Sequence, residues 1–100
     1  MVRPKKNRIV ENQPEISYFE PQGISKISLE EVSLAVDGLE SIRLSDLLGL
    51  SYEEAGKRMG VSRATFGRII QEARKVIADA FINGKAINVE GGNFTLMGKS

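Results

Sequence analysis

The sequence predicts a mainly α-helical fold with a helix-turn-helix core, to which an N-terminal arm and a C-terminal tail add short β segments. Two helix starts, each capped by a serine (Ser51 and Ser62), lie close together in the sequence. Glycines follow the expected helices, and all three prolines fall within the first 24 residues. We therefore expect a basic, proline-containing arm over residues 1–24, a helix-turn-helix domain over residues 25–84, and a C-terminal β-hairpin and tail over residues 85–100.

The composition excludes several classes of protein. The chain of 100 residues has 14 Lys and Arg, 13 Asp and Glu, and no Cys, His or Trp. Without Cys there is no disulfide, thiol nucleophile or Cys-based zinc site, and without His the usual general base and the commonest metal ligand are missing. No apolar run approaches the roughly 20 residues of a membrane span. We expect a soluble, cytoplasmic binding module, not an enzyme, without metal or cofactor.

The charge is distributed unevenly along the chain. Residues 1–10 carry +4, residues 11–50 carry −6, residues 51–80 carry +2, and residues 81–100 carry +1. A basic arm and a basic second half on either side of an acidic middle suggest a surface that faces an anion. The alternative is that the basic arm only increases solubility.

The arm and the segment after it carry few helix signals. Proline disfavours helix, so we expect an irregular arm, with Ile16, Tyr18 and Phe19 anchoring it to the core as a short strand. The apolar residues of segment 27–36 fit both a helical and an alternating pattern. We favour an extended segment that ends at Asp37.

From Asp37 onward the helix signals are strong. Asp37 and Glu40 form an expected N-cap pair, and Gly49 supplies a left-handed stop. The apolar residues expected on one face of this helix are Leu39, Ile42, Leu44 and Leu47.

Two capped helices follow, and together their first part, residues 51–70, forms the expected helix-turn-helix. Ser51 with Glu54 forms a capping box that opens a helix through Met59, and Gly60 allows a sharp turn. Ser62 caps a third helix over residues 63–82, with an apolar stripe at Phe66, Ile69, Ile70, Ala73, Val76, Ile77, Ala80 and Phe81. The tail then predicts a strand at 86–89, a turn at 90–93 and a strand at 94–96, which form a hairpin packed on the arm or on residues 32–36.

The unit around the Gly60-Val61-Ser62 turn is typical of a DNA-binding helix-turn-helix. Gly56 allows close approach of the next helix, Val61 fills the angle between the helices, and the amides that follow Ser62 could bind a phosphate. In such units, side chains at the start of the second helix reach base edges in the major groove. The base-reading candidates are Arg63, Ala64, Thr65, Gly67, Arg68 and Gln71.

Each type of candidate has its own chemistry. Arg63 and Arg68 could each make a bidentate contact to guanine, and Gln71 could contact adenine. The phosphate candidates are Ser62, Lys57, Arg58, Arg74, Lys75 and, in the arm, Arg3, Lys5, Lys6 and Arg8. Two capped helices joined by glycine also occur in helical hairpins that bind no DNA, and an Arg/Lys face can simply be solvated.

Residues 39–81 resemble the fourth conserved region of bacterial sigma-70-type factors and related response-regulator output domains. The shared stretch runs from Tyr52-Glu53-Glu54-Ala55 to Gly60-Val61-Ser62-Arg63. By position, the resemblance places base-reading sites at Arg63, Ala64, Gly67 and Arg68. Gly56 and Gly67 depart from it, because Ala and a larger side chain are commoner there.

The chain as a whole resembles a family of small, functionally uncharacterised prokaryotic proteins that are predicted to bind DNA. The likeness rests on motifs spread over nearly the full length, among them Arg3-Pro4-Lys5-Lys6, Tyr18-Phe19-Glu20-Pro21, Asn83-Gly84-Lys85-Ala86 and Gly91-Gly92. It implies sequence-specific binding of double-stranded DNA, as in a transcriptional regulator. One module reads few base pairs, so we expect a homodimer. The alternative is a protein-interaction module that binds RNA polymerase or another regulator.

Overall fold

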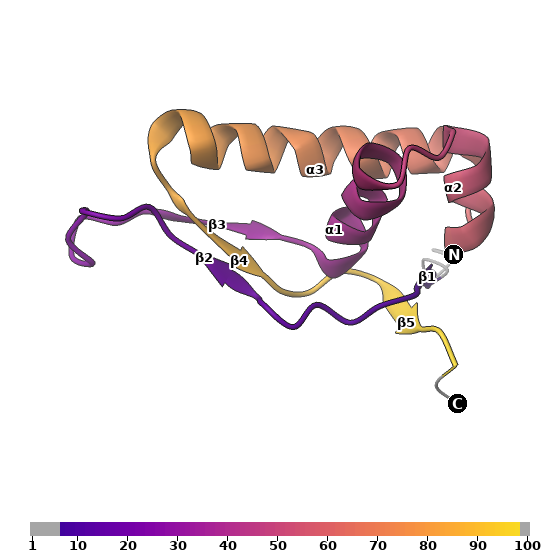
Figure 1. The fold of residues 1–100 in the computed structure, drawn as a ribbon, viewed down its shortest axis with the longest axis horizontal. Coiled ribbons are helices and arrows are strands. Elements are labelled where there is room, and N and C mark those ends of the chain that lie inside the picture. The colour runs from indigo at the N-terminus through magenta and orange to yellow at the C-terminus, as the bar shows by residue number, and fades with distance from the viewer. Residues whose placement is uncertain (1–6, 99–100) are drawn as a thin grey trace, which may run out of the picture.

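The computed structural model describes residues 7–98, in which three α-helices, one π-helical turn and five short strands follow one another along the chain (Figure 1). The predicted combination of helices with short strands is confirmed. The elements are β1 (Arg8–Val10), β2 (Tyr18–Phe19), β3 (Glu31–Leu34), α1 (Val36–Ile42), the π-helical turn η1 (Arg43–Leu47), α2 (Tyr52–Met59), α3 (Arg63–Asn83), β4 (Ala86–Val89) and β5 (Phe94–Leu96).

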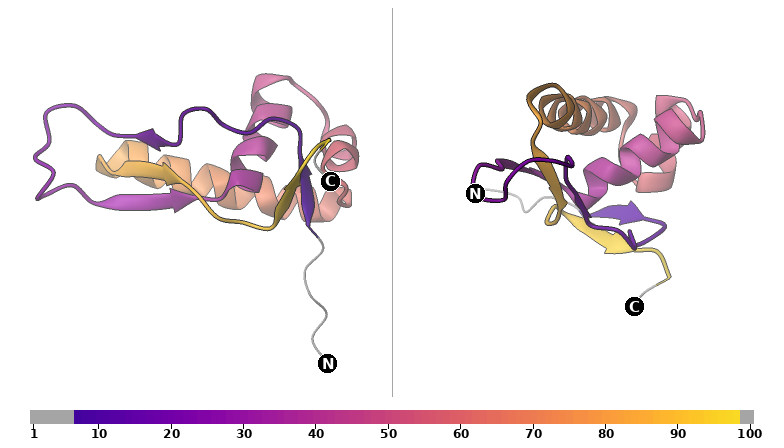
Figure 2. Two further views of the ribbon diagram at one scale, coloured as in Figure 1. Left: turned by 90° about the horizontal axis from the view of Figure 1, so that it is seen from below. Right: turned by 60° about the vertical axis from the view of Figure 1, so that its left-hand side comes forward.

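The strands form two small sheets below the long helix α3. One sheet has the order β2-β4-β3, in which β4 pairs antiparallel with β2 and parallel with β3. The other pairs β1 with β5 in parallel, so that Arg8 lies opposite Phe94 and Val10 opposite Leu96. Figure 2 shows the sheets and the crossing helices from two further sides. The short strand expected at Tyr18 and Phe19 is confirmed, and the extended segment expected before Asp37 is confirmed over Glu31–Leu34. The expected anchoring of the arm to the core by Ile16, Tyr18 and Phe19 is wrong, because all three are exposed and β2 is held through its pairing with β4.

The core consists of two apolar clusters that meet along α3. The first cluster joins α3 to the three-stranded sheet and is built on Leu34, Ala73, Ala80, Ile87 and Val89. The second joins the start of α3 to α2 and η1 and is built on Leu44, Ala55, Met59, Phe66 and Ile70. Val61 packs against the second cluster, as expected for the residue that fills the angle between the helices.

Local signals set the boundaries of α2 and α3 as predicted. The Ser51 hydroxyl accepts a hydrogen bond from the Glu54 amide, and the Ser62 hydroxyl accepts one from the Thr65 amide, each at 3.1 Å. Gly60 ends α2 with a φ of 71°, which is the left-handed region that favours glycine. The predicted third helix is therefore confirmed and ends one residue later than expected, at Asn83.

The predicted C-terminal hairpin is wrong. β4 and β5 lie in different sheets, because the chain between them is held at the corner between β3 and α1 and does not turn back on itself. The Glu90 amide donates to the Leu34 carbonyl and the Val36 amide donates to the Gly91 carbonyl, at 3.0 and 3.1 Å. Both segments instead pair with the parts of the chain that were expected as partners, the arm and residues 32–36.

Three further predictions about the helices are wrong. Asp37 is not an N-cap, because α1 begins at Val36 and Asp37 is buried in the first turn. Leu47 is 76% exposed, since the wider π-helical turn rotates it away from the face that carries Leu44. Phe81 is 77% exposed, because the sheet covers α3 only as far as Ala80. Within residues 7–98, no helix is long and apolar enough to cross a membrane.

Candidate nucleic-acid interface

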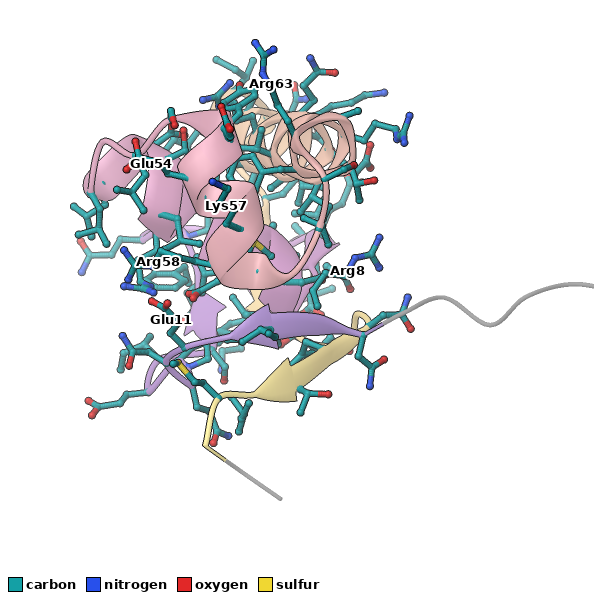
Figure 3. The ribbon with its side chains drawn as sticks, turned by 90° about the vertical axis from the view of Figure 1, so that its right-hand side faces the viewer. Arg8, Glu11, Glu54, Lys57, Arg58 and Arg63 are labelled. Carbon is teal, nitrogen blue, oxygen red and sulfur yellow. The ribbon has the colours of Figure 1, made fainter. Side chains whose placement is uncertain are left out.

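The outward face of the first turns of α3 carries most of the base-reading candidates. Arg63, Ala64, Arg68 and Gln71 are exposed, while the buried face of the same helix carries Phe66 and Ile70. Figure 3 views this end of the molecule and shows Arg63 projecting away from the helices. The 3.6-residue period of the apolar stripe thus identified the exposed face of α3 correctly.

Thr65 and Gly67 lie on the two flanks of this face and are half-buried. The Thr65 hydroxyl accepts a hydrogen bond from the Ser62 hydroxyl at 3.1 Å, so Thr65 belongs to the cap of α3. Gly67 faces the ring of Tyr52, to which an added Cβ would come within 3.8 Å. Thr65 therefore belongs to the cap, and Gly67 lies on the flank of α3 that faces α2.

The phosphate candidates divide into residues that are free to reach a partner and residues held by carboxylates. Within residues 7–98, no ion pair involves Arg63, Arg68 or Lys75. Lys57 is exposed and lies 4.0 Å from Glu53, a distance at which a surface pair contributes little. Arg3, Lys5 and Lys6 lie outside the described residues.

Arg58 is held by Glu11, at the end of β1. The Arg58 Nε donates to Glu11 Oε2 at 2.8 Å, and Arg43 Nη2 donates to Glu11 Oε1 at 2.8 Å. Arg43 also donates from Nε to Glu40 Oε1 at 2.8 Å. The hydrogen bonds from Arg58 and Arg43 lower the pKa of Glu11 from 4.5 to about 2, although burial opposes this shift. This network, labelled in part in Figure 3, fastens β1 to α1, η1 and α2.

Arg74 and Arg8 are also held within the fold. Arg74 donates from Nη2 to Asp46 Oδ1 at 2.7 Å and from Nη1 to Tyr52 Oη at 3.0 Å. The hydrogen bond from Arg74 lowers the pKa of Asp46. Arg8 Nη1 lies 3.8 Å from Asp37 Oδ2. The carboxylate partners of Arg58, Arg74 and Arg8 lie 47, 28 and 29 positions away in the sequence, so no local pattern could have revealed them.

An open groove of about 630 Å³ runs beside the outward face of α3. Thr65, Arg68 and Glu72 line it from α3, while Arg8 and Asp37 line it from β1 and α1. Sequence reasoning missed this groove, because it forms between segments whose pairing could not be predicted. No group of three or more potential metal ligands occurs within the part of the chain described, residues 7–98.

Comparison with known proteins identifies relatives over almost the whole chain. The family model described as "Protein of unknown function DUF134" matches residues 1–97. A "UPF0251 protein" of Desulfosudis oleivorans is 52% identical over 98 residues, which cover 98% of this chain and 71% of the relative. The "UPF0251 protein TTE1845" of Caldanaerobacter subterraneus is 56% identical over 99 residues, which cover 99% of this chain and 84% of the relative. No solved structure matches. The resemblance to a prokaryotic family of uncharacterised proteins is confirmed.

Proposed function

We propose that this chain, which belongs to the DUF134 family, binds double-stranded DNA sequence-specifically through α2, the turn at residues 60–62 and α3, and regulates transcription. The observation that carries the proposal is the start of α3, where exposed arginines project from a capped helix that α2 braces from the side. An α-helix fits the major groove of B-DNA, and side chains in its first turns reach the base edges.

The exposed side chains have distinct roles in this proposal. Arg63 and Arg68 each make a bidentate contact with guanine O6 and N7, and Gln71 contacts adenine. The short side chain of Ala64 lets this face of α3 approach the bases closely. Thr65 acts by holding the cap of α3, and Gly67 leaves the backbone bare on the flank of this face.

The phosphate contacts are assigned to cations other than Arg58 and Arg74, which hydrogen-bond Glu11 and Asp46, and Arg8, whose side chain is 15% exposed and lies 3.8 Å from Asp37. Lys57 and Lys75 are exposed on α2 and α3, and the amides at the start of α3 point towards the same side as the Ser62 cap. Arg3, Lys5 and Lys6 extend this positive charge along the arm. Arg8, Arg58 and Arg74 support the fold, because releasing them would break those three pairs.

Selection from random duplexes, followed by mobility shift, tests the proposal. An enriched motif should appear, and Arg63→Ala and Arg68→Ala should each weaken binding to it by about 5- to 150-fold, the equivalent of about 1–3 kcal/mol. Arg74→Ala, which removes the same charge from the same helix, should leave the preferred sequence unchanged. If no motif is enriched, or if the Arg63→Ala Arg68→Ala double variant binds like the original chain, the proposal is wrong.

The second candidate function is a protein-interaction module for RNA polymerase or another regulator. The exposed Leu47 and Leu48 favour it, because they are neighbours within the acidic part of the chain, residues 11–50. Capture of purified polymerase that survives Arg63→Ala Arg68→Ala and is abolished by Leu47→Gln Leu48→Gln would support this function.

A further inference from the structure

Large apolar side chains lie exposed at the end of the molecule opposite α2. Ile27, Ile82 and Phe81 are 98%, 82% and 77% exposed, and Phe19 and Ile24 are about half exposed. We call these five residues the distal apolar patch. Figure 1 shows that the loop between β2 and β3 and the C-terminal end of α3 lie at this same end.

Three members of the patch come from different segments and lie near one another. Phe19 and Phe81 line one shallow hollow of about 270 Å³ together with Pro21 and Gly84. The Cδ1 atom of Ile24 lies 3.6 Å from the position of a Cβ built on Gly84. Phe19, Ile24 and Phe81 therefore lie around the end of α3, where Ile82 follows Phe81, and Ile27 lies further along the loop that carries Ile24.

The exposed apolar area is large enough for a stable protein interface. With about 200 Å² for a large side chain, the five residues expose roughly 700 Å². A standard interface buries about 800 Å² on each partner, of which a little over half is apolar. The largest apolar patch on a typical monomer measures about 300–600 Å² and is often functional, and the apolar area exposed here is at or above that range.

The surroundings of the patch fit a second copy of the same chain. A two-fold interface brings a surface against itself, so its rim must carry charges of both signs. Glu20 and Lys85 both line the hollow, and Lys26 lies in the neighbouring loop. β2 is also the outer strand of its sheet, and two copies of an outer strand can pair antiparallel across a two-fold axis.

We propose that the distal apolar patch is the interface of a symmetric homodimer. The inference deepens the proposed function and rests on it only for the reading of DNA. Since α3 is about 31 Å long and the patch lies at its far end, the two DNA-binding ends lie on opposite sides of the two-fold axis, up to about 60 Å apart. Each dimer then reads two half-sites about two turns of the double helix apart, about 21 base pairs.

Sedimentation equilibrium of the full chain without DNA tests the interface. The original chain should be a dimer, and Phe81→Gln Ile82→Gln should raise the dimer dissociation constant by at least about 30-fold. Leu47→Gln is the matched control, because Leu47 is as exposed as Phe81 and lies outside the patch. A monomeric original chain, or a double variant that dimerises as tightly as the original, would overturn the inference.

A spin label gives a second measurement that leaves α3 unchanged. The chain has no cysteine, so Ile27→Cys provides one labelling site in the patch and Leu47→Cys one outside it. The distance between the two labels of a dimer should be shorter for Ile27→Cys than for Leu47→Cys. The opposite order, or no dipolar coupling at either site, would contradict a dimer formed through the patch.

The outcomes separate this inference from the proposed function. A dimer that enriches no DNA motif would leave the interface standing and overturn the function. A monomer that enriches a single half-site would do the reverse. If both hold, the selected motif should contain two half-sites, and Phe81→Gln Ile82→Gln should lower affinity for it by about 100-fold or more while sparing affinity for one half-site.

Discussion

Two glycines in the α2–α3 unit have opposite surroundings. A Cβ on Gly56 would lie 2.9 Å from the Val61 carbonyl oxygen, which belongs to the backbone of the turn. A Cβ on Gly67 would meet only the Tyr52 ring, at an ordinary contact distance of 3.8 Å. Gly56 is therefore needed for the close approach of the turn, and Gly67 is not needed for any contact within the fold.

Alanine at these positions should change stability in opposite directions. We expect Gly56→Ala to lower the free energy of unfolding by about 1–3 kcal/mol, because the turn must shift. Gly67→Ala should raise it by about 1 kcal/mol, because alanine favours helix. Urea denaturation measures both changes. If Gly67→Ala stabilises the fold and weakens DNA binding, the bare backbone at this position approaches the DNA; an unchanged affinity would exclude that role.

The Glu11 carboxylate makes stability depend on pH. Its pKa is about 2 in the folded chain and near 4.5 when unpaired, so its stabilising effect is complete above about pH 4.5 and disappears as the pH falls towards 2. Glu11→Gln should therefore lower the urea midpoint at pH 7 and flatten its decline below pH 4.5. Glu15→Gln, an exposed change in the same arm, should leave the original profile intact. If the urea midpoint of Glu11→Gln falls with pH in parallel with that of the original chain, the pairing of Glu11 with Arg58 and Arg43 does not stabilise the fold.

At the scale of the elements, the two serine caps offer a comparison between fold and function. Ser51 caps α2 and Ser62 caps α3 in the same way. Each change to alanine should lower the free energy of unfolding by about 1 kcal/mol, because one helix amide loses its partner. Only Ser62→Ala should also weaken DNA binding, measured by mobility shift under conditions where both variants are folded. An equal effect of Ser51→Ala on binding would mean that stability alone is responsible.

The elements that depend on nearby residues could be predicted from the sequence. The caps at Ser51 and Ser62 and the turn at Gly60 are set within three or four positions, and the exposed start of α3 follows from helical periodicity. The sheet pairing could not be predicted, because β4 joins strands from two distant parts of the chain. Nor does any residue pattern mark the π-helical turn, which moves Leu47 out of the core.

The same distinction applies to the candidate site. Exposure of Arg63, Arg68 and Gln71 could be predicted from one helix alone. The sequence does not predict which arginines hydrogen-bond a carboxylate within the fold. Glu11 meets Arg58, and Asp46 meets Arg74, only after the chain has folded.

For the whole molecule, the net charge of +1 makes DNA binding depend on where the cations lie. We expect Arg3→Ala Lys5→Ala Lys6→Ala to reduce the slope of log affinity against log salt by about 0.9 for each phosphate that the variant no longer neutralises. The preferred DNA sequence should not change, because phosphate contacts do not read bases. Lys26→Ala, in the loop at the end of the molecule opposite α2, should leave the slope as it was. An unchanged slope in the triple variant would make the arm's charge irrelevant to binding.

The parallel pairing of β1 with β5 has a consequence for synthesis on the ribosome. Residues 8–10 emerge early, yet the strand that covers them is made only at residues 94–96. Helices α2 and α3 can form as they leave the tunnel and β1 can pack on α1 and α2, whereas one edge of β1 stays unpaired until nearly all of these residues have been translated. The α2–α3 unit is thus assembled first, and the β1–β5 pair closes after it.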